Sequence, residues 1–149
     1  MDISFIIPCL NCSNFIEHTI NKLQKKLKKN NIFNYELILI DDGSTDNTSK
    51  ILKKLSSKKI RILKNSKNIG KSASLLRGIK VSKKSKIVMI DCDLPYFEYL
   101  ELVLKKLSKN EFIYINRKSK KSKLIGKNLN LYQISRFLIG RIICLVLNM

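Results

Sequence analysis

The fold is decided by the stretch Glu36-Leu-Ile-Leu-Ile-Asp41-Asp42-Gly43-Ser44-Thr45-Asp46-Asn47-Thr48. Its apolar part, 37–40, is continuous rather than alternating, which is typical of a strand inside a parallel sheet. The Asp-Gly pair then predicts a turn, and Thr45, Asp46 or Asn47 is suited to cap a following helix. Asp41 and Asp42 therefore stand at the carboxyl end of a strand, where open α/β sheets bind ligands. A polar cap on the strand end is the plain alternative to a nucleotide or metal site.

Strands and helices are predicted to alternate from the start of the chain to about Arg117. Apolar runs predict strands at 3–8, 35–41, 60–63, 86–90 and 112–116. Apolar residues at helical spacing predict helices at 15–29, 46–57, 71–81 and 99–107. This order predicts an α/β fold in which a mostly parallel central sheet carries helices on both faces.

The charge of the chain favours anionic partners. Its 149 residues include 30 basic and 11 acidic ones, for a formal net charge of +19. Nucleotides, phosphorylated ligands and lipid surfaces fit this charge, although a lysine-rich coding bias explains it equally well. No basic run is interleaved with aromatic residues, so we expect no nucleic-acid partner.

Cysteine usage and the start of the chain point to a reducing compartment. Cysteines at 9, 12, 92 and 144 do not form a secreted disulfide framework in a chain of this size. Met1-Asp2 leads straight into a strand, which predicts no signal peptide. We therefore expect a cytoplasmic protein, with peripheral contact at the cytoplasmic membrane face as an extension of this interpretation.

A second acidic cluster, Asp91-Cys92-Asp93, repeats the logic of the first. It follows the apolar run 87–90, so we expect a buried strand that ends in two carboxylates. Oxygen ligands of this kind hold Mg²⁺ or Mn²⁺ together with ligand phosphates. Because the ends of parallel strands converge, we expect the tips of the second and fourth strands to lie side by side. There they would grip a diphosphate through a bound cation.

The C-terminal part, 118–149, is predicted to be a basic linker followed by an apolar segment. Its longest uninterrupted apolar run, 142–147, is far shorter than the ~20 residues that span a bilayer. A core-packing helix and an interfacial helix with basic flanks both fit the segment. The chain ends inside it, which predicts an incomplete acceptor part behind a core domain of residues 1–117.

Four motifs together resemble the family 2 glycosyltransferases of the GT-A fold, and within them the polyprenyl-phosphate hexose transferases. In chain order, the motifs are Ile6-Ile-Pro8-Cys-Leu-Asn11, the stretch 37–48 quoted above, Asn68-Ile-Gly70-Lys71-Ser-Ala73 with Arg77-Gly78, and Asp91-Cys-Asp93. The resemblance covers residues 3 to about 117. It implies hexose transfer from a GDP- or UDP-sugar to a lipid phosphate or a glycan, with a divalent metal.

The resemblance also implies roles for individual residues. Asp91 and Asp93 would be the catalytic and metal-binding pair, with Asp91 facing the ribose or sugar and Asp93 holding the metal. Asp42 would hydrogen-bond the base, and Lys71 would lie near the nucleotide. The full set implied to bind the nucleotide sugar is Pro8, Leu10, Asn11, Asp41, Asp42, Gly43, Ser44, Lys71, Asp91, Cys92, Asp93 and Arg117. Arg117 would meet the donor phosphate, which suits a guanidinium.

The sequence departs from the family pattern at Cys12, where an acid is common, and at Pro95, where the polyprenyl type often has glutamine. No Asp or Glu follows Glu111. Transfer to a sugar hydroxyl calls for a carboxylate base, whereas an ionised lipid phosphate needs none. The basic residues beside the apolar segment also suit a phosphorylated polyprenol. We therefore expect polyprenyl phosphate as the acceptor, although a missing C-terminal part explains the absent base equally well.

Several alternatives remain at this point. Cys9-Leu-Asn-Cys12 has the context of a thioredoxin-like redox pair, or of a thiolate metal site with Cys92, but either leaves both acidic clusters unexplained. The plain interpretation is two small buried residues. Three further alternatives concern the whole chain. It could be a truncated or inactive nucleotide-sugar-binding remnant, a transferase acting on a glycan hydroxyl or, more remotely, a basic nucleic-acid-binding domain.

Overall fold

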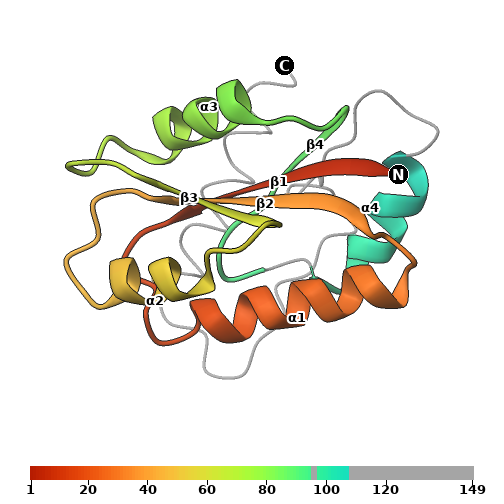
Figure 1. The fold of residues 1–149 in the computed structure, drawn as a ribbon, viewed down its shortest axis with the longest axis horizontal. Coiled ribbons are helices and arrows are strands. Elements are labelled where there is room, and N and C mark those ends of the chain that lie inside the picture. Colours follow the sequence, from red (N-terminus) through yellow and green to blue (C-terminus); the bar gives the residue numbers. More distant parts are fainter. Residues whose placement is uncertain (95–96, 108–149) are drawn as a thin grey trace, which may run out of the picture. The chain divides into compact units, whose positions relative to one another are not determined.

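A computed structural model describes residues 1–94 and 97–107, which lie within one compact unit, Met1–Asn110. Its elements alternate as the sequence predicts (Figure 1). In chain order they are β1 (Asp2–Cys9), α1 (Ile16–Lys29), β2 (Asn34–Asp41), α2 (Thr48–Leu55), β3 (Ile60–Lys64), α3 (Lys71–Val81), β4 (Lys86–Met89), the 3-10 helix η1 (Phe97–Tyr99) and α4 (Leu100–Leu107). The predicted strand at 112–116, Arg117 and the segment 118–149 lie outside the described residues.

The four strands form one parallel sheet in the order β3-β2-β1-β4. Cys9 at the end of β1 is in register with Asp41 at the end of β2, and Asp41 is in register with Lys64 at the end of β3. The expectation that the tips of the second and fourth strands lie side by side is wrong, because β1 runs between them. Their carboxyl ends still share one edge of the sheet, and the loop after β1 separates the two acidic clusters.

Helices cover both faces of the sheet, as predicted. In Figure 1, α3 lies on one side of the strands and α1 and α2 lie on the other. On the α3 side, the buried residues Ile6, Ile38 and Ile40 pack against Leu75 and Ile79 of the helix. On the opposite side, α1 buries Ile16, Ile20, Leu23 and Leu27. Burial on two faces explains the continuous apolar runs 5–7 of β1 and 37–40 of β2.

The strand before the second acidic cluster is less buried than its sequence predicts. In β4 only Val88 is buried, whereas Ile87 is 38% exposed and Met89 is 52% exposed. Within the described sheet β4 is an edge strand, so it lacks a neighbour on its outer side. The sequence of β4 thus has the apolar run of an interior strand, but Ile87 and Met89, which lie on the α3 side of the sheet, remain accessible to solvent.

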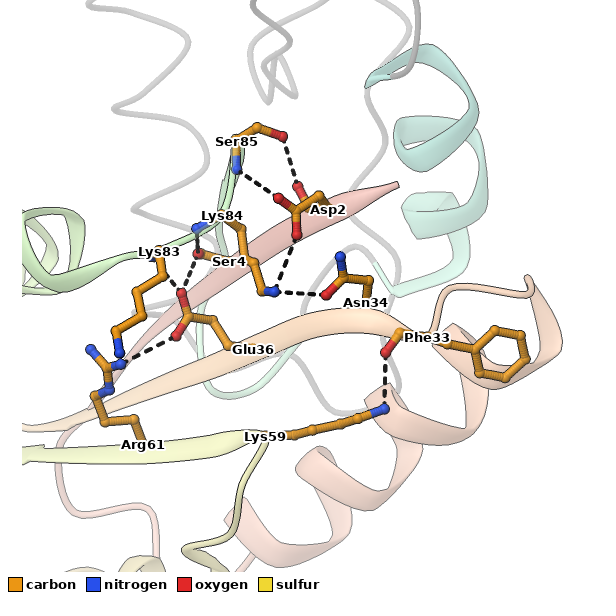
Figure 2. Close-up of polar contacts among 10 residues, drawn as sticks. All are labelled: Asp2, Ser4, Phe33, Asn34, Glu36, Lys59, Arg61, Lys83, Lys84 and Ser85. Carbon is orange, nitrogen blue, oxygen red and sulfur yellow. Dashed lines mark hydrogen bonds and ion pairs between the residues drawn. The ribbon is translucent and has the colours of Figure 1, made fainter.

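A buried carboxylate organises the amino end of the strands (Figure 2). Glu36 on β2 accepts hydrogen bonds at Oε1 from Ser4 Oγ (2.7 Å) and from the Lys83 backbone N–H (2.6 Å). Its Oε2 lies 3.7 Å from Arg61 Nη2 on β3. The contacts join three strands to the loop that enters β4. They lie at the amino end of the strands, opposite the two acidic clusters. They therefore stabilise the end of the sheet where no ligand is predicted to bind.

Candidate active site

The turn after β2 is held by its first carboxylate. Asp41 is buried, its Oδ1 accepts a hydrogen bond from the Ser44 backbone N–H (2.9 Å), and its Oδ2 accepts one from the Ser49 hydroxyl. A carboxylate that bonds a backbone N–H a few residues ahead closes an Asx-type turn. Asp41 therefore shapes the loop and anchors α2, and its side chain faces the protein interior.

Hydrogen bonds join the loop after β1 to the loop after β2. Asn11 Oδ1 accepts a hydrogen bond from the Thr45 backbone N–H (2.9 Å), and the Asn11 N–H donates to Ser44 Oγ (3.1 Å). Cys12 N–H donates to Thr48 Oγ1 (2.8 Å). Asn11 adopts φ 48°, a left-handed conformation that asparagine tolerates better than most residues. The predicted site residues Asn11 and Ser44 are thus brought together at one rim.

Asp46 adds further hydrogen bonds between the same two loops. Its Oδ2 accepts a hydrogen bond from the Ser13 N–H (3.1 Å) and its Oδ1 accepts one from the Thr48 N–H (2.9 Å) at the start of α2. Hydrogen bonds from Thr48 are the largest cause that holds the pKa of Asp46 well below its usual value, and those from Ser13 act in the same direction. The charged form of Asp46 therefore fixes both loops.

Asp42 is buried and directed at the loop between β3 and α3. Its side chain is 3% exposed, and Oδ1 accepts hydrogen bonds from Asn65 Nδ2 (2.8 Å) and the Ile69 N–H (2.9 Å). Oδ2 accepts one from the Gly70 N–H (3.0 Å). Burial opposes ionisation, but the Ile69, Asn65, Ser74 and Gly70 hydrogen bonds outweigh it and lower the pKa of Asp42. A direct hydrogen bond to a base would have to replace one of these partners.

The glycine after Asp42 allows that loop to approach closely. Gly43 has φ 74°, and a Cβ there would lie 2.5 Å from the backbone N of Asn68 and 2.5 Å from the carbonyl carbon of Lys67. No side chain fits at that distance. The Asp-Gly turn therefore serves two purposes, because it reverses the chain after β2 and leaves room for the 67–68 backbone.

Lys71 connects the two acidic clusters across the tip of β1. It is the first residue of α3, directly after the loop that Asp42 holds, and its ammonium forms an ion pair with Asp91 Oδ1. The Lys71 side chain is 57% exposed and that of Asp91 is 26% exposed. The predicted residues Asp42, Lys71 and Asp91 are therefore parts of one chain of contacts at the carboxyl edge.

The remaining predicted residues differ in how far they reach solvent. Asp93 is exposed, Cys92 and Pro8 are half-buried, and Leu10, directly after β1, is 43% exposed. An exposed leucine between two polar loops offers an apolar surface for a planar ring. Arg117 belongs to the part of the chain that the structure does not describe.

The donor set at the end of β4 fits a hard divalent cation that shares its coordination with a ligand. Asp91 and Asp93 supply carboxylate oxygens, which Mg²⁺ and Mn²⁺ prefer, and Asp93 is open to solvent. Among residues 1–94 and 97–107, no three His, Cys, Asp or Glu side chains are grouped to hold a metal ion. Mg²⁺ is typically coordinated by one or two carboxylates, with phosphate oxygens and water at the remaining coordination positions, and Asp91 and Asp93 fit this pattern.

The three cysteines among the described residues are all reduced in this structure. Cys9 and Cys12 are buried free thiols, and Cys92 is a half-buried one. Contact with the Cys9 thiol, with burial adding to it, raises the pKa of Cys12 to about 12, against an opposing contact from Cys92. Contact with Cys12, together with burial, also raises the pKa of Cys92. Cys9 and Cys12 are thus small buried residues, as the plain interpretation predicts, and the raised pKa of Cys12 is opposite to the shift that makes a cysteine reactive.

A buried polar group beneath the site, Asn65, was not predicted from the sequence. Asn65 Nδ2 donates to Asp42 Oδ1 and also lies 2.9 Å from Ser74 Oγ of α3, while its Oδ1 accepts from Arg77 Nη1. Its signal was available, because Asn65 directly follows β3 at the same edge as the two acidic clusters. A polar residue that directly follows a strand of a parallel sheet is therefore a candidate for the site, as an acidic residue there is.

Comparison with known proteins identifies the family. Residues 4–142 match the model of glycosyl transferase family 2, and the chain belongs to this family. It is 35% identical over 121 residues to a dolichyl-phosphate beta-glucosyltransferase of Dictyostelium discoideum, an alignment that covers 73% of this chain and 37% of the relative. The human dolichyl-phosphate beta-glucosyltransferase is 34% identical over 99 residues, covering 61% of this chain and 31% of that protein. The chain thus spans about a third of the length of these relatives.

Solved structures confirm the α/β fold of the GT-A type. The mannosyltransferase PcManGT from Pyrobaculum calidifontis, in complex with GDP-Man and Mn²⁺, superposes with a TM-score of 0.60 at 18% identity, covering 72% of this chain and 32% of that one. S. aureus TarS 1-349 in complex with UDP gives a TM-score of 0.55 at 19% identity, covering 81% and 40%. In the described part of the chain, every helix falls short of the length and apolar character needed to cross a membrane.

Proposed function

We propose that this chain carries the donor half of a glycosyltransferase that moves a hexose from a nucleoside diphosphate sugar to polyprenyl phosphate, with inversion and with Mg²⁺ or Mn²⁺. The observation that carries the proposal is the Lys71–Asp91 contact, which joins the loop held by Asp42 to the tip of β4. It gathers a cation and carboxylates at the sheet edge where α/β folds bind nucleotides.

The donor nucleotide is assigned to the rim made by the loops after β1, β2 and β4. Leu10 would pack against the base, and Pro8 would support it from the end of β1. Asn11, Asp41, Asp42, Gly43 and Ser44 contribute by fixing the loops that line the rim, as their mutual contacts support. Lys71 would bind a phosphate oxygen, with Arg117 as a second cation, and Cys92 would line the floor.

Asp91 and Asp93 are assigned to hold the divalent cation, which would neutralise the diphosphate and stabilise it as a leaving group. The donor set fits this assignment by chemistry, since carboxylates are hard oxygen ligands. Asp93 is the exposed member and would face the metal directly, whereas Asp91 would share the metal and face the ribose or the sugar. The structural neighbour PcManGT, solved in complex with GDP-Man and Mn²⁺, supports this type of chemistry.

The acceptor is assigned from the relatives and from acid–base chemistry. Both relatives above are named dolichyl-phosphate transferases. A phosphate oxygen is ionised at neutral pH, so it can attack the anomeric carbon opposite the departing diphosphate without a general base. Attack from that side inverts the configuration. Such an acceptor would bring the protein to a membrane surface, which we propose is the cytoplasmic face.

A transfer assay tests this proposal. The full chain, radiolabelled UDP-glucose or GDP-mannose and Mn²⁺ are incubated with polyprenyl phosphate in detergent or with a soluble glycan, and the products are separated by solvent extraction. We expect label in the lipid fraction, and its loss in Asp93→Ala. Label only in the glycan would contradict the acceptor. Nucleotide-sugar binding without any transfer would identify a donor-binding domain without its catalytic partner segment.

A further inference from the structure

The metal and a lysine are assigned to the same carboxylate. Lys71 Nζ is paired with Asp91 Oδ1, and Asp91 is also one of the two residues assigned to the divalent cation. We propose that Lys71 is a built-in counter-cation, which competes with the metal at Asp91 in the absence of donor and moves to the donor diphosphate when donor binds. This inference rests on the proposed function and adds an order of events to it.

The backbone beneath Lys71 is anchored while its charged end is accessible. Ile69 and Gly70 donate their N–H groups to the buried carboxylate of Asp42 over 2.9 and 3.0 Å. The Gly70 N–H also lies 2.9 Å from Asn68 Oδ1. The side chain of Lys71 is nevertheless 57% exposed. An ammonium on a flexible four-carbon stem can therefore change partners while its Cα remains in place.

Asp42 is a positioning residue in this scheme. It touches neither the proposed metal nor the phosphates, but its two oxygens determine where α3 begins and thus where Lys71 starts. Asn65 supports it from below through a 2.8 Å hydrogen bond, and the Asn65 amide also contacts Ser74 in α3. The first acidic cluster therefore acts on the second one through Lys71.

Electrostatics sets the ammonium and the metal in competition. An ammonium and a divalent cation at one carboxylate repel each other, so the ion pair at Oδ1 weakens metal binding by Asp91 even where the metal takes the other oxygen. A diphosphate offers Lys71 a new anionic partner and offers the metal further oxygens. Donor and metal should therefore help each other to bind, and linkage requires each to raise the affinity of the other by the same factor.

The test measures Mn²⁺ alone, by the electron paramagnetic resonance signal of free Mn²⁺, without nucleotide. Four proteins are compared: wild type, Lys71→Met, Lys71→Arg and Lys67→Met, the last removing an exposed lysine of the same loop. Partly exposed ion pairs are weak, so we expect Lys71→Met to bind Mn²⁺ about two- to fivefold more tightly. Lys71→Arg keeps the cation and Lys67→Met keeps the ion pair, so both should match wild type.

A second measurement uses UDP and GDP in the presence of EDTA. Because Lys71 would be the cation that meets the diphosphate, Lys71→Met should bind the accepted nucleotide about two- to fivefold more weakly, with no change in Lys67→Met. Thermal melting of each variant verifies that it is folded.

The outcomes separate this inference from the function on which it rests. If wild type binds Mn²⁺ and nucleotide but Lys71→Met binds Mn²⁺ alone no better than wild type, the counter-cation role is wrong and the proposed function stands. An equal gain in Lys67→Met would show a general charge effect and would also overturn the role. If wild type binds neither Mn²⁺ nor any nucleotide, the proposed function fails and this inference fails with it.

Discussion

Asn65 Nδ2 donates a hydrogen bond of 2.8 Å to Asp42 Oδ1, and each of the two residues is 3% exposed. The ends of β2 and β3 are thus joined by a buried polar contact under the candidate site. Buried polar groups are nearly always hydrogen-bonded, because leaving one without a partner costs about 1–3 kcal/mol. The two side chains therefore depend on each other, and the loop that carries Lys71 depends on both.

Asp42→Asn should destabilise the fold although it preserves the size of the side chain. An amide offers one acceptor oxygen where the carboxylate offered two. Either the Ile69 N–H and Asn65 Nδ2 would face an NH2 group, or the Gly70 N–H would keep only its contact with Asn68 Oδ1. We expect a loss of about 1–3 kcal/mol in the free energy of unfolding, measured by urea denaturation at pH 7. Unchanged stability would show that the 65–70 loop is held by other contacts.

The same pair of proteins should differ in pH dependence. The pKa of Asp42 is lowered in the folded state, so its charge stabilises the protein above the unfolded pKa of about 3.9. That contribution is lost as the pH falls through the folded pKa. The difference in unfolding free energy between wild type and Asp42→Asn should therefore shrink below about pH 4. A difference that stays constant between pH 7 and pH 3 would contradict the assignment.

Gly43→Ala should be more damaging than Gly70→Ala. Both glycines have positive φ, 74° and 90°, so both variants strain the backbone by about 1–3 kcal/mol. Only at Gly43 would the new Cβ also meet backbone atoms, at 2.5 Å, whereas nothing lies within 4 Å of a Cβ at Gly70. Overpacking adds about 1–3 kcal/mol. Equal losses in the two variants, measured by urea denaturation, would mean that the 67–68 loop moves freely away from the turn.

Glu36→Gln is the matched control for the carboxyl edge. Like Asp42, Glu36 is a buried carboxylate that accepts a backbone N–H, but its contacts with Ser4, Lys83 and Arg61 lie at the amino end of the strands (Figure 2). We expect a loss of about 1–2 kcal/mol in unfolding free energy. Nucleotide affinity, measured by isothermal titration calorimetry, should remain that of wild type. A fall in that affinity would indicate coupling between the two edges of the sheet.

The order and type of the elements could be predicted because burial on two faces leaves a clear trace in the sequence. The runs at 3–7 and 37–40 are apolar at every position but Ser4 and are indeed buried throughout. Strand order leaves no such trace. Both acidic clusters follow apolar strands, and nothing in either stretch reveals that β1 lies between them. The exposure of Ile87 and Met89 likewise depends on which neighbours β4 has, which its own residues do not specify.

The candidate site could be predicted by location but only partly by contact. Strand ends gave the edge at which Asp42, Lys71 and Asp91 lie. They did not reveal that Asp41 and Asp42 turn their oxygens toward their own chain, because loop conformation is set by contacts between residues distant in sequence. Asn65 was missed for the same reason, since its partners Asp42 and Arg77 become neighbours only after β3 and α3 have packed.

The most direct test of the central claim is a thermal-shift titration with UDP, GDP and their hexose conjugates, each with and without Mn²⁺. Ligands that bind only the folded state raise its stability by mass action, by about 2.7 kcal/mol at a hundredfold excess over the dissociation constant. We predict that one nucleotide raises the melting temperature, that Mn²⁺ enlarges the shift, and that Asp93→Ala removes the Mn²⁺-dependent part while Glu36→Gln retains it. A Mn²⁺-dependent shift of the same size in Asp93→Ala, or no shift with any nucleotide, would contradict the account.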